Sequence, residues 1–160
     1  MYSKTELMKR LNNLAIAAIV VSFLGFLDAS YLTIKHFRGE VAPCSLLEGC
    51  EVVTTSKYST IGDIPISLFG AMFYISVLAA AFFYLDTKST KAIKSIPLLT
   101  LTGFIVSAVL VYLQIFVLKA ICVYCMFSAL TSTLLFVIGI LIFRSTEKNE
   151  KSDINSSTAN

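Results

Sequence analysis

Four long apolar runs constrain the fold of this chain more than any other feature of its sequence. They cover residues 11–34, 64–85, 96–118 and 121–143, and each is 22 to 24 residues long. A helix needs about 20 residues to cross roughly 30 Å of hydrocarbon. Every backbone polar group needs an internal partner in lipid, so such runs are read as helices. We therefore predict an all-α membrane protein, a bundle of four transmembrane helices.

The distribution of charge indicates one membrane domain with polar ends. Only 14% of the residues are charged, against about 25% in a typical soluble domain. We predict a cytoplasmic N-terminus over residues 1–10, a membrane domain over 11–143 and a disordered cytoplasmic tail over 144–160. The first run is longer than the apolar core of a secretory signal peptide, and no small-residue cleavage pattern follows it. We therefore expect it to stay in the membrane.

The basic residues predict the orientation, because Lys and Arg are retained on the cytoplasmic side. Nine of the thirteen would lie on the side of the two termini and of the connection between the second and third helices: Lys4, Lys9, Arg10, Lys88, Lys91, Lys94, Arg144, Lys148 and Lys151. We predict a protein of the cell membrane, surrounded by lipid, with both termini in the cytoplasm. The net charge of +3 follows from this bias, and we expect no nucleic-acid partner.

All four cysteines fall on the predicted outer side. Cys44 and Cys50 lie in the long first loop, and Cys122 and Cys125 lie at the start of the fourth helix. Cysteines that act only as small apolar packing residues would be scattered over both sides. Disulfides persist in the oxidising compartment outside the cytoplasm. The placement therefore indicates disulfide chemistry.

The two cysteine pairs differ physically. Cys122 and Cys125 are three residues apart and share one helical face, at a helix N-terminus that stabilises a thiolate. This spacing is also half of a zinc site, but the other pair lacks it and the chain has one histidine, so we predict no metal. Cys44 and Cys50 can close a short disulfide loop. A static staple there, in a membrane scaffold with structural disulfides, is the alternative to a redox role.

Two pairs on one side suggest a relay from an exposed pair to a pair at the membrane surface. Thiol–disulfide exchange only moves electron pairs between sulfurs, so a net oxidant has to enter. The sequence has no haem or metal ligand set and no glycine-rich nucleotide motif. We therefore expect a lipid-soluble quinone as the electron acceptor.

Other residues near the outer side have two readings each. Asp28 is an ionisable residue inside a predicted span. It could tune thiol protonation or relay a quinone proton, or it could hydrogen-bond locally and fix the first loop. Phe69, Phe73 and Tyr74 fall on neighbouring turns of the second helix. Such aromatic residues pack or form an interfacial belt, and a quinone ring would also pack between them.

Together these residues resemble the vitamin K epoxide reductase family, in particular its bacterial and archaeal members, from about residue 25 to 143. The resemblance is carried by the DASYLT segment at 28–33, the Cys44…Cys50 loop, Thr55-Ser56, Pro65 with Phe69-Gly70 and Phe73-Tyr74, and Cys122-Val-Tyr-Cys125. The order of the cysteine pairs differs from that of DsbB-type quinone-coupled oxidases, which place Cys-x-x-Cys in their first loop.

The resemblance implies an outward-facing first loop that covers the active site, and a role for each cysteine. Cys44 and Cys50 would exchange with a thioredoxin-fold (DsbA-like) protein, and Cys50 would then pass electrons to Cys122. Cys125 would face a quinone of the ubiquinone, menaquinone or vitamin K type, with Phe69, Phe73 and Tyr74 around it. Ser56 matches a hydroxyl residue near the family's active centre, where it could bond a quinone oxygen, steady a thiolate or cap the next turn.

Two departures from the vertebrate pattern bear on the substrate. Those enzymes have an asparagine where this chain has Ile66, and a tyrosine where it has Ala129. Both losses favour a plain quinone and net protein oxidation over the alternative, reduction of vitamin K epoxide or quinone proper. Many prokaryotic relatives carry a fused thioredoxin domain, whereas this sequence ends after the fourth helix, so we expect a separate partner.

Overall fold

The computed structural model describes residues 4–40, 49–62 and 64–158. Its long elements are α1 (Lys4–Phe37), α3 (Ile66–Thr87), α4 (Thr90–Tyr112), which continues into the π-helix η1 (Leu113–Leu118), and α5 (Val123–Thr158). Three short elements lie in the first loop: α2 (Gly49–Thr54), β1 (Thr60–Ile61) and β2 (Ile64–Pro65). Within the described residues, four helical stretches are long and apolar enough to cross a membrane. The predicted four-helix bundle is confirmed.

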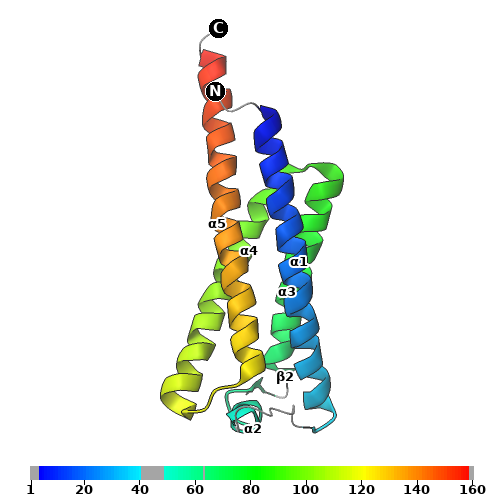
Figure 1. Cartoon of the computed structure of the whole chain (residues 1–160), viewed down its shortest axis with the longest axis vertical. Coiled ribbons are helices and arrows are strands. Elements are labelled where there is room, and N and C mark those ends of the chain that lie inside the picture. The colour runs from blue at the N-terminus through cyan, green and yellow to red at the C-terminus, as the bar shows by residue number, and fades with distance from the viewer. Residues whose placement is uncertain (1–3, 41–48, 63, 159–160) are drawn as a thin grey trace.

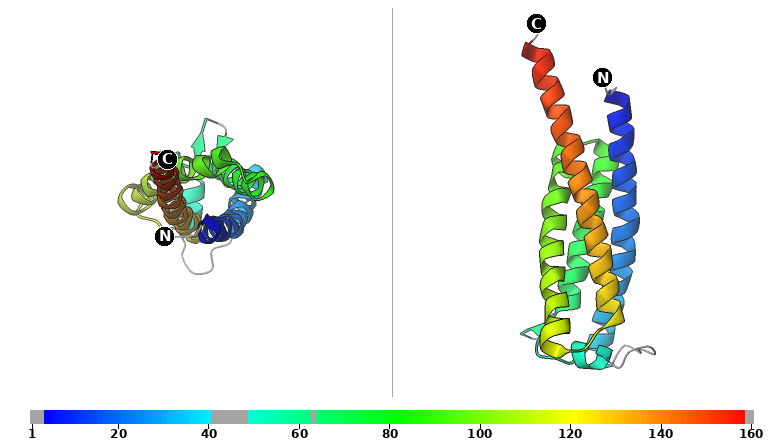
Figure 2. Two further views of the ribbon diagram at one scale, coloured as in Figure 1. Left: turned by 90° about the horizontal axis from the view of Figure 1, so that it is seen from above. Right: turned by 60° about the vertical axis from the view of Figure 1, so that its left-hand side comes forward.

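The long helices form a ring when they are viewed along the bundle (Figure 2). α1 packs against α3 and α5, and α4 also packs against α3 and α5. The first loop closes one end of the ring, where β1 and β2 pair as a short antiparallel hairpin with Thr60 opposite Pro65. Both termini and the turn between α3 and α4 lie at the opposite end (Figure 1). The regions that carry nine of the basic residues therefore share one end of the bundle.

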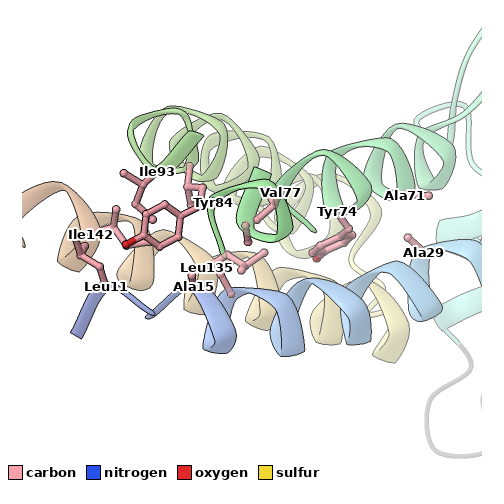
Figure 3. Packing of buried hydrophobic residues seen from close by; sticks show 13 residues of the cluster. Leu11, Ala15, Ala29, Ala71, Tyr74, Val77, Tyr84, Ile93, Leu135 and Ile142 are labelled. Carbon is pink, nitrogen blue, oxygen red and sulfur yellow. The ribbon is translucent and has the colours of Figure 1, made fainter. Parts of the chain in front are cut away.

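Small residues let the helices approach closely. Ala15 and Ala18 of α1 and Ala81 of α3 are fully buried. In lipid the hydrophobic effect does not drive helices together, so close packing between small residues stabilises their association. Tyr74 of α3 lies over Gly25 of α1, where any added Cβ would overlap the ring. Figure 3 shows Tyr74 and Val77 of α3 filling the space between the helices.

The helices extend beyond the predicted limits at both ends of the chain. α1 begins at Lys4, within the predicted N-terminal segment, and α5 continues to Thr158 where disorder was expected. Hydropathy marks only the part of a helix that lies in hydrocarbon. Polar residues can continue the helix beyond that part where no Gly or Pro interrupts it. No Gly or Pro follows Phe143 that would stop α5. The second predicted span began at residue 64, but Ile64 and Pro65 form β2 of the hairpin and α3 begins at Ile66.

Candidate active site

The short helix α2 carries a first-loop cysteine onto the end of the bundle. Cys50 and Val53 of α2 are buried and form one apolar cluster with Cys122. A Cβ built at Gly49 would lie 2.6 Å from the carbonyl oxygen and 2.7 Å from the nitrogen of Ile121. Backbone atoms cannot yield as a flexible side chain can, so only glycine fits this close approach. Gly49 thus allows Cys50 to lie against the segment that leads into Cys122.

The cysteines at this end differ in redox state. Cys50 is disulfide-bonded, whereas Cys122 and Cys125 are free thiols. Cys44, the predicted partner of Cys50, lies outside the described residues, so that pairing stays a prediction. A disulfide and a dithiol packed at one end of the bundle are the two reactants that thiol–disulfide exchange needs.

Cys122 is the N-cap of α5. Its carbonyl oxygen accepts the N–H of Met126 at 3.0 Å, and its Sγ accepts the N–H of Cys125 at 3.4 Å. Sulfur thus occupies the place of the side-chain oxygen in an ordinary N-cap. The hydrogen bond from the Cys125 thiol lowers the pKa of Cys122 to about 7; burial opposes this shift, and the backbone N–H groups of Cys125 and Tyr124 support it. The geometry therefore favours a thiolate nucleophile at Cys122.

We expect alkylation of Cys122 by iodoacetamide to rise with a midpoint near pH 7, because the thiolate is the reacting form. Tandem mass spectrometry of the labelled peptide, taken over a pH series, separates Cys122 from Cys125. In Cys125→Ala the stabilising thiol is gone, so the midpoint should move up toward the roughly 8.5 of an ordinary cysteine. A midpoint near that value in the unsubstituted protein would contradict the assignment.

A buried glutamine organises the connection ahead of Cys122. The side-chain oxygen of Gln114 accepts the N–H of Cys122 at 3.2 Å. The backbone carbonyl oxygen of Gln114 accepts the N–H of Ala120 at 3.1 Å. The same oxygen accepts the N–H of Lys119, whose backbone is left-handed with φ 51°. Gln114 lies in η1, and π-helical turns occur frequently at functional sites. This residue was not predicted from the sequence, although a lone amide near the outer end of an apolar run is a functional signal.

A cavity of about 710 Å³ lies between the loop that follows α2 and the adjacent ends of the four long helices. Five of the residues singled out in the sequence line it together: Ser56, Phe69, Phe73, Tyr74 and Cys125. Its volume is within the range of about 300–1,000 Å³ of small-molecule sites. Cys122 and Asp28 do not line it. Of the Cys-x-x-Cys pair, Cys122 is buried in the α2 cluster, whereas Cys125 packs against that cluster and also reaches the cavity.

Aromatic residues of α3 form a fixed part of the cavity wall. The Tyr74 hydroxyl lies 2.8 Å from the Ser128 carbonyl oxygen, to which it donates, and 2.7 Å from the Thr131 hydroxyl. Phe73 meets the Tyr74 ring edge-on, with centroids 5.0 Å apart. Phe73 also packs on Gly103 of α4, where an added Cβ would overlap its ring. Close packing on both sides leaves these rings little freedom to move.

Ser56 and Asp28 are the two polar residues for which the sequence left both a functional and a structural role open. The Ser56 hydroxyl donates to the Val53 carbonyl at 2.8 Å and so closes the turn after α2, which agrees with the turn-capping alternative. Oδ2 of Asp28 is buried and has no hydrogen-bond partner within the described part of the chain. The local bond expected to fix the first loop is therefore not made by that oxygen. A role of Asp28 in proton transfer stays a prediction.

Comparison with known proteins places this geometry in a family. No curated protein matches the chain. A sequence model of the Vitamin K epoxide reductase family matches residues 16–140, a range that holds all four cysteines and parts of all four long helices. In the described ranges, no group of three or more His, Cys, Asp or Glu could hold a metal ion. The chain belongs to the Vitamin K epoxide reductase family and is a multi-pass membrane oxidoreductase.

Proposed function

We propose that the protein is a quinone-dependent thiol–disulfide oxidoreductase that forms disulfides in a separate thioredoxin-fold protein. The observation that carries the proposal is the different placement of two cysteines one helical turn apart. Cys122 is buried in the α2 cluster with Cys50 and does not line the cavity, whereas Cys125 packs against that cluster and also lines the cavity. One turn of α5, about 5 Å, thus connects a surface for disulfide exchange with a chamber for a small molecule.

The electrons balance over three transfers, from the partner to the first loop, from the first loop to the helix pair and from the helix pair to the quinone. A partner dithiol is oxidised to a disulfide while the bond between Cys44 and Cys50 is reduced. The thiolate of Cys50 then attacks an oxidised Cys122–Cys125 pair, and a second exchange restores the first-loop disulfide. The reduced helix pair finally gives two electrons and two protons to the quinone, which leaves as a quinol. In the structure Cys50 is disulfide-bonded, and Cys122 and Cys125 are free thiols. This state corresponds to the stage before the last transfer.

The cavity wall fits a quinone better than an epoxide. Ile66 and Ala129, the two apolar replacements of vertebrate polar residues, both line the cavity. An apolar wall with the rings of Phe69 and Phe73 favours a flat, neutral molecule. This supports ubiquinone, menaquinone or vitamin K quinone as acceptor and argues against a specific epoxide reductase.

A direct assay tests the proposal. Purified protein in detergent should oxidise a reduced DsbA-like protein and consume one short-chain quinone for each disulfide formed. Quinone absorbance and thiol titration follow the two half-reactions separately. A protein with all four cysteines replaced by alanine is the control. Absence of quinone consumption with both the protein partner and dithiothreitol would reject the function.

We further propose that the end bearing α2 faces the outside of the cell membrane and that both termini are cytoplasmic. The clustering of the basic regions at the opposite end (Figure 1) supports this orientation. In a background without native cysteines, a cysteine introduced at Glu51, which is exposed on α2, should be labelled by an impermeant maleimide on intact cells or spheroplasts. A cysteine introduced at Ser3 in a background without native cysteines should be labelled only after lysis. The reverse pattern would contradict the orientation.

A further inference from the structure

The orientation of the Gln114 amide follows from its partner. The backbone N–H of Cys122 can only donate, so the oxygen of the amide is the atom that faces it, at 3.2 Å. The amide nitrogen with its two hydrogens therefore lies on the other side of the group. Gln114 also lines the cavity.

The two amide hydrogens have no partner within the described part of the chain. Gln114 is only 3% exposed, near the outer end of a membrane-spanning segment. The amide nitrogen is not among the buried atoms without a partner, so this donor reaches open space, and Gln114 lines the cavity. A ligand that displaces water there loses affinity unless it replaces the hydrogen bond of the water. The open donor of Gln114 therefore indicates a ligand that brings an acceptor oxygen.

Nearby cavity hydroxyls are already engaged with one another. Ser107 and Ser132 share a hydrogen bond of 2.6 Å, and the Tyr74 hydroxyl is held by Ser128. The cavity-facing positions Ile66 and Ala129 carry no polar atom at all. An amide on this wall is thus well placed to bond a carbonyl.

We propose that the Gln114 side-chain NH₂ donates a hydrogen bond to a carbonyl oxygen of the quinone in the cavity, while its oxygen holds the backbone of Cys122. This inference rests on the proposed function and assigns a residue to its acceptor site. One side chain then sets the position of both redox centres, because the Cys-x-x-Cys backbone and the acceptor bond opposite ends of a single planar amide. Gln114 is accordingly a binding and positioning residue.

Equilibrium binding separates this role from turnover. The Cys122–Cys125 pair is first oxidised, so that no thiol in it can react with the ligand, and binding of a short-chain ubiquinone is measured by calorimetry. Gln114→Met removes both the donor and the acceptor at similar length. Gln114→Glu keeps an oxygen for the Cys122 N–H but loses the donor at neutral pH. Loss of one hydrogen bond should raise Kd about tenfold in both variants.

The carboxyl variant provides a test that a merely structural role would not pass. As the pH falls from about 8 to about 5, the substituted carboxyl takes up a proton and regains a donor. Kd of Gln114→Glu should then approach the value of the unsubstituted protein, whereas Kd of Gln114→Met should not. Other groups that line the cavity can titrate, so the unsubstituted protein is measured at each pH: Lys35, His36, Glu40, Lys57, Tyr58, Tyr74 and Cys125.

The outcomes separate the inference from the function on which it rests. Quinone reduction by the unsubstituted protein, with weakened binding in both variants and recovery only in Gln114→Glu, supports the assignment. An unchanged Kd in both variants overturns it and leaves the function standing. Weakened binding without recovery at low pH also overturns the donor role. If the unsubstituted protein binds no quinone and reduces none, the proposed function itself fails.

Discussion

Replacing either Cys122 or Cys125 by alanine is expected to abolish quinone reduction with every thiol donor. The helix pair is the only step through which electrons reach the cavity in the proposed relay, and one remaining thiol cannot deliver an electron pair as a disulfide. The rate should fall to that of the uncatalysed reaction. Quinone absorbance, followed with a protein partner and separately with dithiothreitol, measures this loss.

The first-loop cysteines should behave differently, which makes the prediction specific to a relay. Cys44→Ala and Cys50→Ala should lose turnover with the protein partner but keep part of it with dithiothreitol, which is small enough to reduce Cys122 directly. Cys125→Ser should in addition accumulate a Cys50–Cys122 disulfide, because Cys122 can attack Cys50 and release the thiol of Cys44, while the thiol of Cys125 that would resolve the new bond toward the helix pair is gone. Equal loss in all four alanine variants with dithiothreitol would contradict the relay.

Much of the fold follows from hydropathy, because lipid leaves few alternatives to a helix. The number and approximate place of the four spans were predicted correctly. The helices themselves extend beyond the apolar runs, since α1 begins at Lys4 and α5 continues to Thr158. The short elements α2, β1–β2 and η1 were missed. Their few residues carry no periodic signal, and α2 depends on a tertiary contact between Gly49 and Ile121 that the sequence does not reveal.

The site was predictable where the chemistry resides in rare residue types. Cysteine positions indicated redox pairs, and the structure places Cys125 with Phe69, Phe73 and Tyr74 around one cavity. Gln114 was missed because its role depends on a π-helical turn. In this turn both its backbone carbonyl and its side chain accept hydrogen bonds from the connection between η1 and α5. Several roles were open for Ser56, and its bond to the Val53 carbonyl depends on the turn after α2, which the sequence does not reveal.

Gly49 links this packing to function, and its substitution is expected to slow the relay strongly. With alanine at this position the added Cβ would lie 2.6 Å from the Ile121 carbonyl oxygen, so α2 has to move away by roughly 1 Å. A misplacement of about 1 Å in reacting groups can cost on the order of 100-fold in rate. We therefore expect Gly49→Ala to lose most of the turnover driven by the protein partner, with Gly49→Val losing more.

The same substitution should affect the later steps much less, because the close approach of Gly49 is to the backbone of Ile121 and not to the rings of the cavity wall. Turnover with dithiothreitol should stay within about twofold of the unsubstituted protein, since this donor bypasses the transfer from Cys50 to Cys122. Gly70→Ala is a matched control, because its Cβ would meet only the Ala29 Cβ at an ordinary 3.7 Å. The informative quantity is the ratio of partner-driven to dithiothreitol-driven rate. If that ratio is unchanged in Gly49→Ala, close packing of α2 on Ile121 is not what couples the two cysteine pairs.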